Sequence, residues 1–389
     1  MKVTQIYDIM NNVTNEVLGK SELIKEDLSN IVDVGTEIFE SANVDNYVKS
    51  LVNHIGKVIF VDRVYSGSVP SILMDSWEYG SIVEKISCEI PKATTNDTWA
   101  LNDGQEYKQD IFHSPKVSAK FFNSKVTFEV PMSFTTRQVK ESFDSATQLN
   151  SFISMIENSV NKSMTIKLDS LIMRTINNMT ALTMVNDLSD GKKIDTSKTG
   201  VKAINLLALY NKNSDVKLTI DNCLENADFI RFATYYINLY IDRVSKISTL
   251  FNIGKRERFT PKDDLHLVLL SDFEKSSEIF LQSNTFHNDL VKLNNYDTVP
   301  YWQATGLDYN IKNTSAINIT CNDGTKNIDV DVKGVIGVMF DRDCIGVTNL
   351  DRRVTTNYNA RAEFYNNYYK FDAGYYNDTN ENYIVFFVG

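Results

Sequence analysis

The stretch 132–190 contains neither glycine nor proline, and this absence constrains the fold more than any other feature of the sequence. Glycine and proline interrupt helices most strongly, so a long helix can run through this stretch unbroken. Apolar side chains recur in it at helical spacing, first at Val139, Phe143, Leu149, Ile153, Ile156 and Val160 and then at Leu168, Leu171, Ile172, Ile176 and Met179. The pattern predicts one helix of about 40 residues and about 60 Å, or two helices that meet near residues 162–165.

The sequence also indicates where this helix begins and how it packs. Thr135, with Gln138 three residues later, fits a capping box at the start of a helix. The apolar spacing does not keep a strict heptad across the polar middle of the stretch, which argues against a coiled coil.

The segment before the helix, about 58–133, has a different character and holds four of the six prolines. Strand-like pieces occur at 81–90, 116–122 and 125–130, with Asn123-Ser124 as a plausible tight turn between the last two. Residues 94–114 form a polar loop that carries three aromatic side chains, Trp99, Tyr107 and Phe112. Such a long loop without a core is unusual in a compact domain, so it is either disordered or packed on something else, such as another subunit.

The remaining segments divide into helical and mixed regions. Apolar spacing predicts helices within the first 60 residues, with His54 as a solvent-edge residue. Residues 200–333 read as mixed α/β, with a helix at 226–253, and continuous apolar runs predict buried strands at 265–270 and 334–340. The aromatic-rich end predicts twisted antiparallel strands with a turn near Gly374 or residues 377–378, and a last buried strand at 383–388.

Composition and motifs exclude several classes of function. The formal net charge of −10 argues against a protein that binds nucleic acid by neutralising phosphates. The four cysteines are scattered, and the sequence has no metal-ligand motif, phosphate-binding loop or nucleophile elbow, so we expect neither a cofactor nor an enzyme. No signal peptide or transmembrane stretch is recognisable, so we expect no membrane partner.

Several motifs resemble the C-terminal part of the major capsid proteins of tailed bacteriophages. They are the FDRD turn at 340–343, the segment TNYNARAEFYNNYY at 356–369, GYYND at 374–378 followed by Glu381-Asn382, and the terminal apolar strand 384–388. The stretch 128–160 also resembles the junction between extended loop and spine helix in that family.

The resemblance implies an α+β fold, the tailed-phage and herpesvirus major capsid (Johnson) fold. Its parts would be an N-terminal helical arm at 1–60, an extended β loop with flanking strands at 61–135, and a peripheral domain with the spine helix at 136–199. An axial domain would follow at 200–340, and then peripheral-domain strands and the terminal strand at 341–389.

The resemblance also implies a function. The protein would self-assemble into pentamers and hexamers of an icosahedral phage head that encloses double-stranded DNA without binding it specifically. Its location would be the virion capsid, assembled in the host cytoplasm. Some relatives carry an N-terminal scaffolding segment, whereas a helical arm begins at once here, so we expect a separate scaffolding protein, a portal and, as optional partners, decoration proteins.

Two other functions stay open from the sequence. The first is the shell of an encapsulin-like nanocompartment, which has the same fold and encloses a protein cargo. The second is a soluble hydrolase whose catalytic residues, such as His266 and Asp343, come from distant parts of the chain. For the capsid function we expect subunit contacts through Trp99, Tyr107 and Phe112 of the loop and through the ion-pairing residues Arg352, Arg353 and Glu363.

Overall fold

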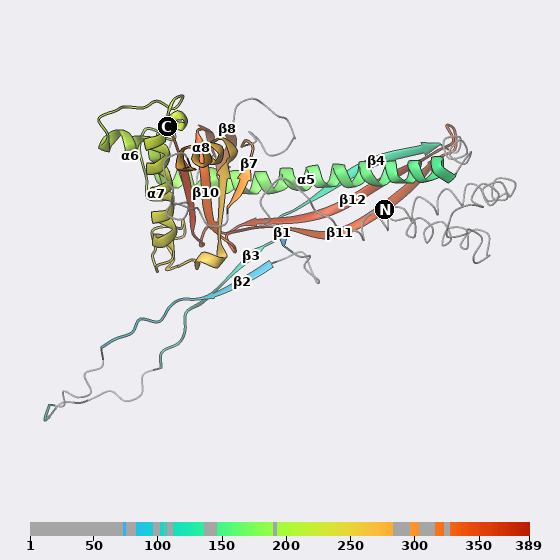
Figure 1. Ribbon diagram of the computed structural model, residues 1–389. Coiled ribbons are helices and arrows are strands. Elements are labelled where there is room, and N and C mark those ends of the chain that lie inside the picture. The colour runs from blue at the N-terminus through green and yellow to red at the C-terminus, as the bar shows by residue number, and fades with distance from the viewer. Residues whose placement is uncertain are drawn as a thin grey trace.

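A long helix, two main sheets and a projecting two-stranded ribbon make up the computed structural model (Figure 1). The structure describes residues 73–74, 83–95, 102–104, 106, 112–135, 146–189, 193–282, 296–302, 316–322 and 327–389. The helices expected within residues 1–60, and His54 with them, lie outside the described residues.

The long helix α5 runs without a break from Ala146 to Leu188, and its 43 residues span about 65 Å. One helix therefore forms where the sequence allowed one or two. The apolar positions from Val160 onward that predicted it are buried, namely Val160, Leu168, Leu171, Ile172, Ile176 and Met179. Thr135 is the last residue of strand β4 (Lys125–Thr135), and Gln138 lies outside the described residues, so the expected capping box is not seen at the described start of α5.

A long antiparallel ribbon lies along α5. Strands β11 (Ile345–Asn359) and β12 (Phe364–Asn377) pair over almost their whole length, and β12 pairs on its other edge with β4. The short β1 (Leu73–Met74) adds to β11. Alternate residues of β12, such as Tyr365, Tyr369 and Phe371, are buried in the core that α5 shares with this sheet. The aromatic cluster of the sequence therefore supplies both faces of this ribbon, with Tyr365, Tyr369 and Phe371 on the buried face of β12 and Phe364 and Tyr368 on its more exposed face.

One of the two predicted turn positions is right and the other is wrong. Gly374 lies inside β12, whereas β12 ends at Asn377 and a turn at 378–381 leads into β13, next to the predicted position 377–378. The reversal between β11 and β12, from Asn359 to Phe364, was not predicted. The Asn359 side chain accepts hydrogen bonds from the backbone N–H groups of Arg361 and Ala362, which closes the turn without a glycine.

A compact lobe is built on a five-stranded sheet of order β5-β13-β10-β6-β7. Its strands are β5 (Ala203–Asn205), β13 (Tyr383–Phe387), β10 (Val335–Asp341), β6 (Leu265–Leu270) and β7 (Asp297–Val299). The predicted strands at 265–270, 334–340 and 383–388 are confirmed. Every residue of β10 and β13 is buried, because α5 covers one face of the sheet and helices α6 (Leu206–Asn213), α7 (Ala227–Val244) and α8 (Ser271–Gln282) cover the other.

Smaller elements complete the body. The hairpin of β8 (Ala316–Asn322) and β9 (Asn327–Lys333) packs on α5, and the short helices η1 (Cys223–Glu225) and η2 (Lys262–Asp264) flank α7 and β6. In the part of the chain that the structure describes, no helix has a stretch that is both long enough and apolar enough to cross a bilayer.

The last element is a ribbon of β2 (Val83–Cys88) and β3 (Val117–Phe122), which points away from the body (Figure 1). Residues Asn123-Ser124 join β3 to β4, but these two strands pair with different partners, β2 and β12. This pair of residues is therefore a change of sheet rather than the tight turn of a hairpin.

Candidate assembly surface

The projecting ribbon has two faces of opposite chemistry. The antiparallel register pairs Val83 with Phe122, Lys85 with Lys120 and Ser87 with Ser118 on one face. It pairs Glu84 with Phe121, Ile86 with Ala119 and Cys88 with Val117 on the other. Because side chains alternate along a strand and paired residues share a face, one face carries two lysines and the other is mainly apolar.

The apolar face points away from the body. Ile86 is 67% exposed, Phe121 62% and Val117 58%, and the neighbouring Cys88 is exposed as well. Contiguous exposed apolar side chains of this kind mark an interaction surface in a soluble protein. We call Ile86, Cys88, Val117, Ala119 and Phe121 the outer face of the ribbon.

The charged face rests on the body. The Nζ atoms of Lys85 and Lys120 each lie 2.9 Å from a carboxylate oxygen of Asp378, whose side chain is only 4% exposed. Lys85 also lies 3.3 Å from Glu381, and it donates a hydrogen bond of 2.9 Å to the backbone oxygen of Asp343. We call Lys85, Lys120, Asp378 and Glu381 the charged junction. It fixes the ribbon against the loop between β12 and β13.

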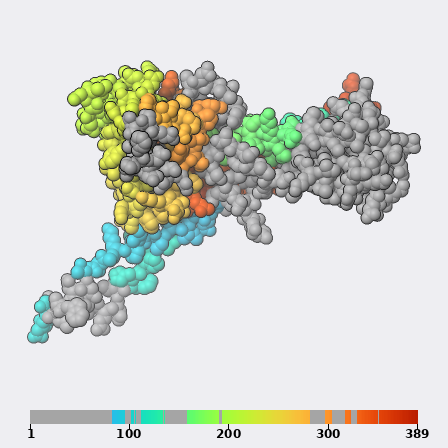
Figure 2. All heavy atoms as spheres, in the orientation of Figure 1, coloured from blue at the N-terminus to red at the C-terminus, as the bar shows by residue number. Residues whose placement is uncertain are grey.

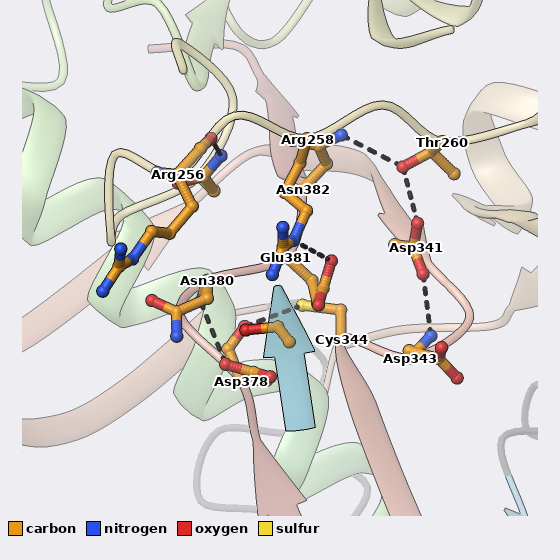
Figure 3. Close-up of polar contacts among 12 residues, drawn as sticks. Arg256, Arg258, Thr260, Asp341, Asp343, Cys344, Asp378, Asn380, Glu381 and Asn382 are labelled. Carbon is orange, nitrogen blue, oxygen red and sulfur yellow. Dashed lines mark hydrogen bonds and ion pairs between the residues drawn. The ribbon is translucent and has the colours of Figure 1, made fainter. Parts of the chain in front are cut away.

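Residues of the compact lobe support the carboxylates of this junction from the other side (Figure 3). Arg258 Nε lies 3.3 Å from Glu381. The Thr260 hydroxyl donates to the buried carboxylate of Asp341 at 2.7 Å, and the amide of Asn382 donates to the Thr260 hydroxyl at 3.0 Å. The two motifs FDRD and GYYND-EN thus meet in space, where they hold the base of the ribbon.

The electrostatics of the junction follow from this geometry. Burial opposes ionisation of Asp378, but hydrogen bonds from Lys120 and Lys85 outweigh it and hold the pKa of Asp378 below its ordinary value. Burial likewise opposes the charge of Lys85, but its hydrogen bond to Asp378 and the attraction of the Asp378 and Glu381 carboxylates together outweigh that effect and raise the pKa of Lys85. Both groups are therefore charged at neutral pH.

An aromatic contact and a second ion pair extend the attachment of the ribbon. The rings of Phe122 and Tyr376 lie 4.9 Å apart between centroids, beside the charged junction. Further along the ribbon, Arg256 Nη1 lies 2.7 Å from Glu89. The direction in which the ribbon leaves the body is thus determined by contacts within one chain.

The residues expected from the sequence to make subunit contacts fall in three places. Trp99 and Tyr107 lie outside the described residues, whereas Phe112 is described and is 90% exposed. Arg353 pairs within its own sheet, with Asp372 at 2.7 Å and Asp351 at 3.1 Å. Arg352 is its partly buried neighbour on β11, and Glu363 is exposed in the turn between β11 and β12, with a φ of 53°.

The structure therefore does not bring Glu363 together with the two arginines. The outer face and the charged junction are the features that the sequence analysis missed. The alternation of lysines with apolar residues around 81–90 and 116–122 indicates a ribbon with one charged face and one apolar face. The register that pairs Lys85 with Lys120 cannot be predicted from this spacing.

The residues of the hydrolase alternative have packing and turn roles. The ring of His266 stacks on Phe340 at 5.6 Å, and burial lowers the pKa of His266. The backbone N–H of Asp343 donates to the side chain of Asp341 at 2.9 Å, as in a tight turn. Within the described ranges, no group of three or more histidine, cysteine, aspartate or glutamate residues is placed to hold a metal ion.

A spine helix along a long antiparallel sheet, a compact α/β lobe and a projecting ribbon define a capsid protein of the tailed-phage (Johnson) fold. The chain belongs to the Phi29-like phage major capsid protein family, whose model matches residues 10–387. It is therefore a shell protein of a phage capsid. No curated protein sequence matches it.

Solved phage structures contain chains that are similar to this one. A chain in the capsid structure of Staphylococcus phage Andhra has the same fold, with a TM-score of 0.51 at 7% identity, and the match covers 85% of this chain and 86% of that one. A chain in the structure of the head fiber and inner core protein gp22 of bacteriophage P68 has a TM-score of 0.44 at 8% identity, covering 84% of this chain and 86% of that one. A chain in the capsid structure of cyanophage P-SCSP1u has a TM-score of 0.42 at 11% identity, and the match covers 84% of this chain and 93% of that one.

Proposed function

We propose that copies of this capsid protein assemble with one another into the pentamers and hexamers of an icosahedral head, and that the outer face of the ribbon is buried on a neighbouring copy. The observation that supports this is the orientation of the ribbon. Its charged face is satisfied within the chain, while its apolar face has 58–67% of Val117, Phe121 and Ile86 exposed. An apolar face of this kind gains free energy when a second copy covers it, about 25 cal/mol per Å² removed from water.

The parts of the fold then take distinct roles. In this proposal the compact lobe is the axial domain near the symmetry axis of each capsomer. The sheet of β4, β11 and β12 with α5 is the peripheral domain, and the ribbon with residues 94–114 is the extended loop. The last strand, β13, lies in the sheet of the compact lobe, so the axial domain includes the end of the chain.

The remaining partners follow from charge and from the mechanical role. A net charge of −10 suits a wall that encloses double-stranded DNA without binding it specifically. The proposal assigns no catalytic residue and no cofactor to the chain. It includes assembly in the host cytoplasm with a separate scaffolding protein and a portal.

Negative-stain electron microscopy with light scattering on the purified protein tests the proposal. We expect closed shells, or rings of five and six. Deletion of residues 94–114 should leave the protein folded and abolish assembly, and an assembly-competent deletion variant would contradict the role of the loop. DNA inside shells from infected cells supports the phage head, whereas a protein cargo would support the nanocompartment alternative.

A further inference from the structure

The two ends of helix α7 carry opposite charge and exposed apolar side chains. The segment 214–228, which runs into the first turn of α7, has four carboxylates and one lysine. The segment 245–262, just after α7, has five cations and one carboxylate, Glu257. The helix between them is 18 residues long, so the two segments lie about 27 Å apart along its axis. Figures 1 and 2 show them on opposite sides of the compact lobe, the first beside α6 and the second beside the ribbon.

The first segment presents an acidic and apolar surface, which we call the acidic end. Asp215, Asp221 and Glu225 are exposed and make no ion pair with a described residue. The lysine of the segment, Lys217, does not neutralise them, because its ammonium group donates to the backbone oxygens of Asn211 and Ser214. Val216 is 59% exposed and Ile220 51% exposed among these carboxylates.

The second segment presents a basic and apolar surface, which we call the basic end. Three of its cations are engaged within the chain: Arg256 with Glu89, Arg258 with Glu381 and Lys262 with Asp242. Lys246 and Lys255 are exposed and make no ion pair with a described residue.

Three apolar side chains accompany these two lysines, namely Ile247, Leu250 and Phe259, each between 50% and 58% exposed. Ser248 and Arg258 exchange both backbone hydrogen bonds of an antiparallel bridge, which brings the flanking Ile247 and Phe259 opposite each other. The basic end is therefore a built surface rather than scattered residues.

Helix-dipole stabilisation does not account for this distribution of charge. The favourable interaction with the dipole extends over the first and last turns of a helix. Asp215 and Asp221 precede α7 by several residues and Lys255 follows it by several, so all three lie beyond that range. The helix dipole also does not explain why exposed apolar side chains accompany the charges at both ends.

We infer that the acidic end of one copy binds the basic end of the next copy within a capsomer. The inference rests on the proposed function and names the surfaces that carry it. The two surfaces lie on opposite sides of one lobe and differ from each other, so the contact is heterologous. A heterologous contact repeated around an axis closes into a ring when the rotation from one copy to the next divides a full turn, as in pentamers and hexamers.

The position of the ribbon agrees with this arrangement. The ion pair between Arg256 and Glu89 joins the basic end to the ribbon of the same copy. The basic end and the base of the ribbon therefore lie side by side, so a copy bound at the basic end also lies close to the ribbon.

Charge reversal at each end tests the inference. Lys246→Glu with Lys255→Glu makes both ends of a subunit acidic, and Asp215→Lys with Asp221→Lys makes both ends basic. Each double variant alone should need a protein concentration about tenfold or more above that of the wild type for half-assembly, which corresponds to about 1.4 kcal/mol per contact. The fourfold variant, which carries both reversals, should recover assembly, because its two ends are complementary again.

A mixture of the two double variants gives the sharpest result. Every contact between unlike subunits is complementary and every contact between like subunits is repulsive, so subunits must alternate around a ring. We expect native mass spectrometry of the mixture to show even-membered rings and to lose the pentamers of the wild type. A heterologous contact through these ends predicts this parity effect, and a change in stability alone does not.

Cross-linking gives a second measurement that does not require complete shells. The exposed Cys88 is first replaced in a Cys88→Ser background. In that background, Ile220→Cys together with Leu250→Cys should give a ladder of covalent oligomers when a short bismaleimide is added. A variant with only one of these two cysteines should give no product larger than a dimer. The inference would be overturned if the charge-reversal double variants had the melting temperature of the wild type and reached half-assembly at the same protein concentration. Pentamers in the mixture of the two double variants would also overturn it. A wild-type protein that forms neither rings nor shells, even together with its scaffolding protein, would instead overturn the proposed function.

Discussion

Lys85 and Lys120 lie directly opposite each other in the register of β2 and β3, and both ammonium groups bind the carboxylate of Asp378 at 2.9 Å. Like charges directly opposite each other destabilise an isolated pair of strands. The ribbon is therefore stabilised in its observed direction only where Asp378 and Glu381 neutralise the two lysines. A ribbon held in this direction before assembly loses less conformational entropy when it binds a neighbour.

Asp378→Asn tests this role of the junction. The amide keeps an acceptor for the backbone N–H of Asn380, at 3.0 Å in the native protein, but it removes the charge that the lysines share. We expect the free energy of unfolding to fall by about 1–3 kcal/mol. Spin labels on Cys88 and on Ile279→Cys, both exposed, should show a broader distance distribution because the ribbon is no longer fixed.

Asp343→Asn is the matched control for that measurement. Asp343 is an exposed carboxylate of the same region, but Lys85 binds its backbone oxygen rather than its side chain. Its distance distribution should match that of the wild type. An Asp378→Asn variant with an unchanged distribution would show that the aromatic contact of Phe122 is sufficient to hold the ribbon.

The stability provided by the junction should depend on pH at both extremes. The pKa of Asp378 is lowered on folding, so its contribution is complete above its unfolded value of about 4 and is lost as the pH falls through the folded value. The pKa of Lys85 is raised, so its contribution is complete below about 10 and is lost at higher pH. The difference in melting temperature between the wild type and Asp378→Asn should be constant at neutral pH and shrink below about pH 4. A difference that persists undiminished at pH 2–3 would contradict the assignment of the charge to Asp378.

Strong local patterns made much of the fold predictable. The absence of helix breakers predicted α5, and the apolar runs LHLVLL and VIGVMF predicted strands that are buried on both faces. These features depend on local periodicity and on the hydrophobicity of consecutive residues, which a single sequence displays directly.

The candidate site depended on pairings that periodicity does not encode. Asn123-Ser124 was predicted to be a tight turn because a strand pattern lies on each side of it. The pairing of a strand depends on tertiary packing, however, and β3 and β4 belong to different sheets. Arg353 was predicted to contact another subunit because it lies in a short basic pair among acidic residues, and the sequence does not show whether such an ion pair forms within one chain or between copies. Its partner, Asp372, lies on the adjacent strand of the β11–β12 ribbon, 19 positions further along the chain. The charged junction joins residues 258 and 296 positions apart, so it was not visible in the sequence.

The two phenylalanines of β3 separate assembly from stability. Phe121 lies on the outer face and is 62% exposed, whereas Phe122 lies on the other face against Tyr376. We expect Phe121→Ser with Ile86→Ser to change the free energy of unfolding by no more than about 0.5 kcal/mol and to abolish shells.

Phe122→Ser should instead destabilise the free subunit, with a loss of about 1–3 kcal/mol in the free energy of unfolding, and should still allow shells to form. Thermal melting in dilute solution and electron microscopy at high concentration measure the two effects. Normal shells from the outer-face variant would mean that no neighbour covers that face.

Arg353 and Glu363 allow a test of which charged residues of the long ribbon contact another copy. Arg353 pairs with Asp372, and its hydrogen bond lowers the pKa of that carboxyl group. Because Arg353 is partly exposed and satisfied within its own chain, Arg353→Ala should lower the free energy of unfolding by about 0–1 kcal/mol and leave the yield of shells unchanged. Glu363 is exposed at the end of the ribbon and forms no ion pair with a described residue, so Glu363→Lys should lower the shell yield with little effect on melting, as expected of a charge that faces a neighbour. Analytical ultracentrifugation measures the yield, and the opposite ranking of the two variants would mean that Arg353 exchanges its internal partner for one on another copy during assembly.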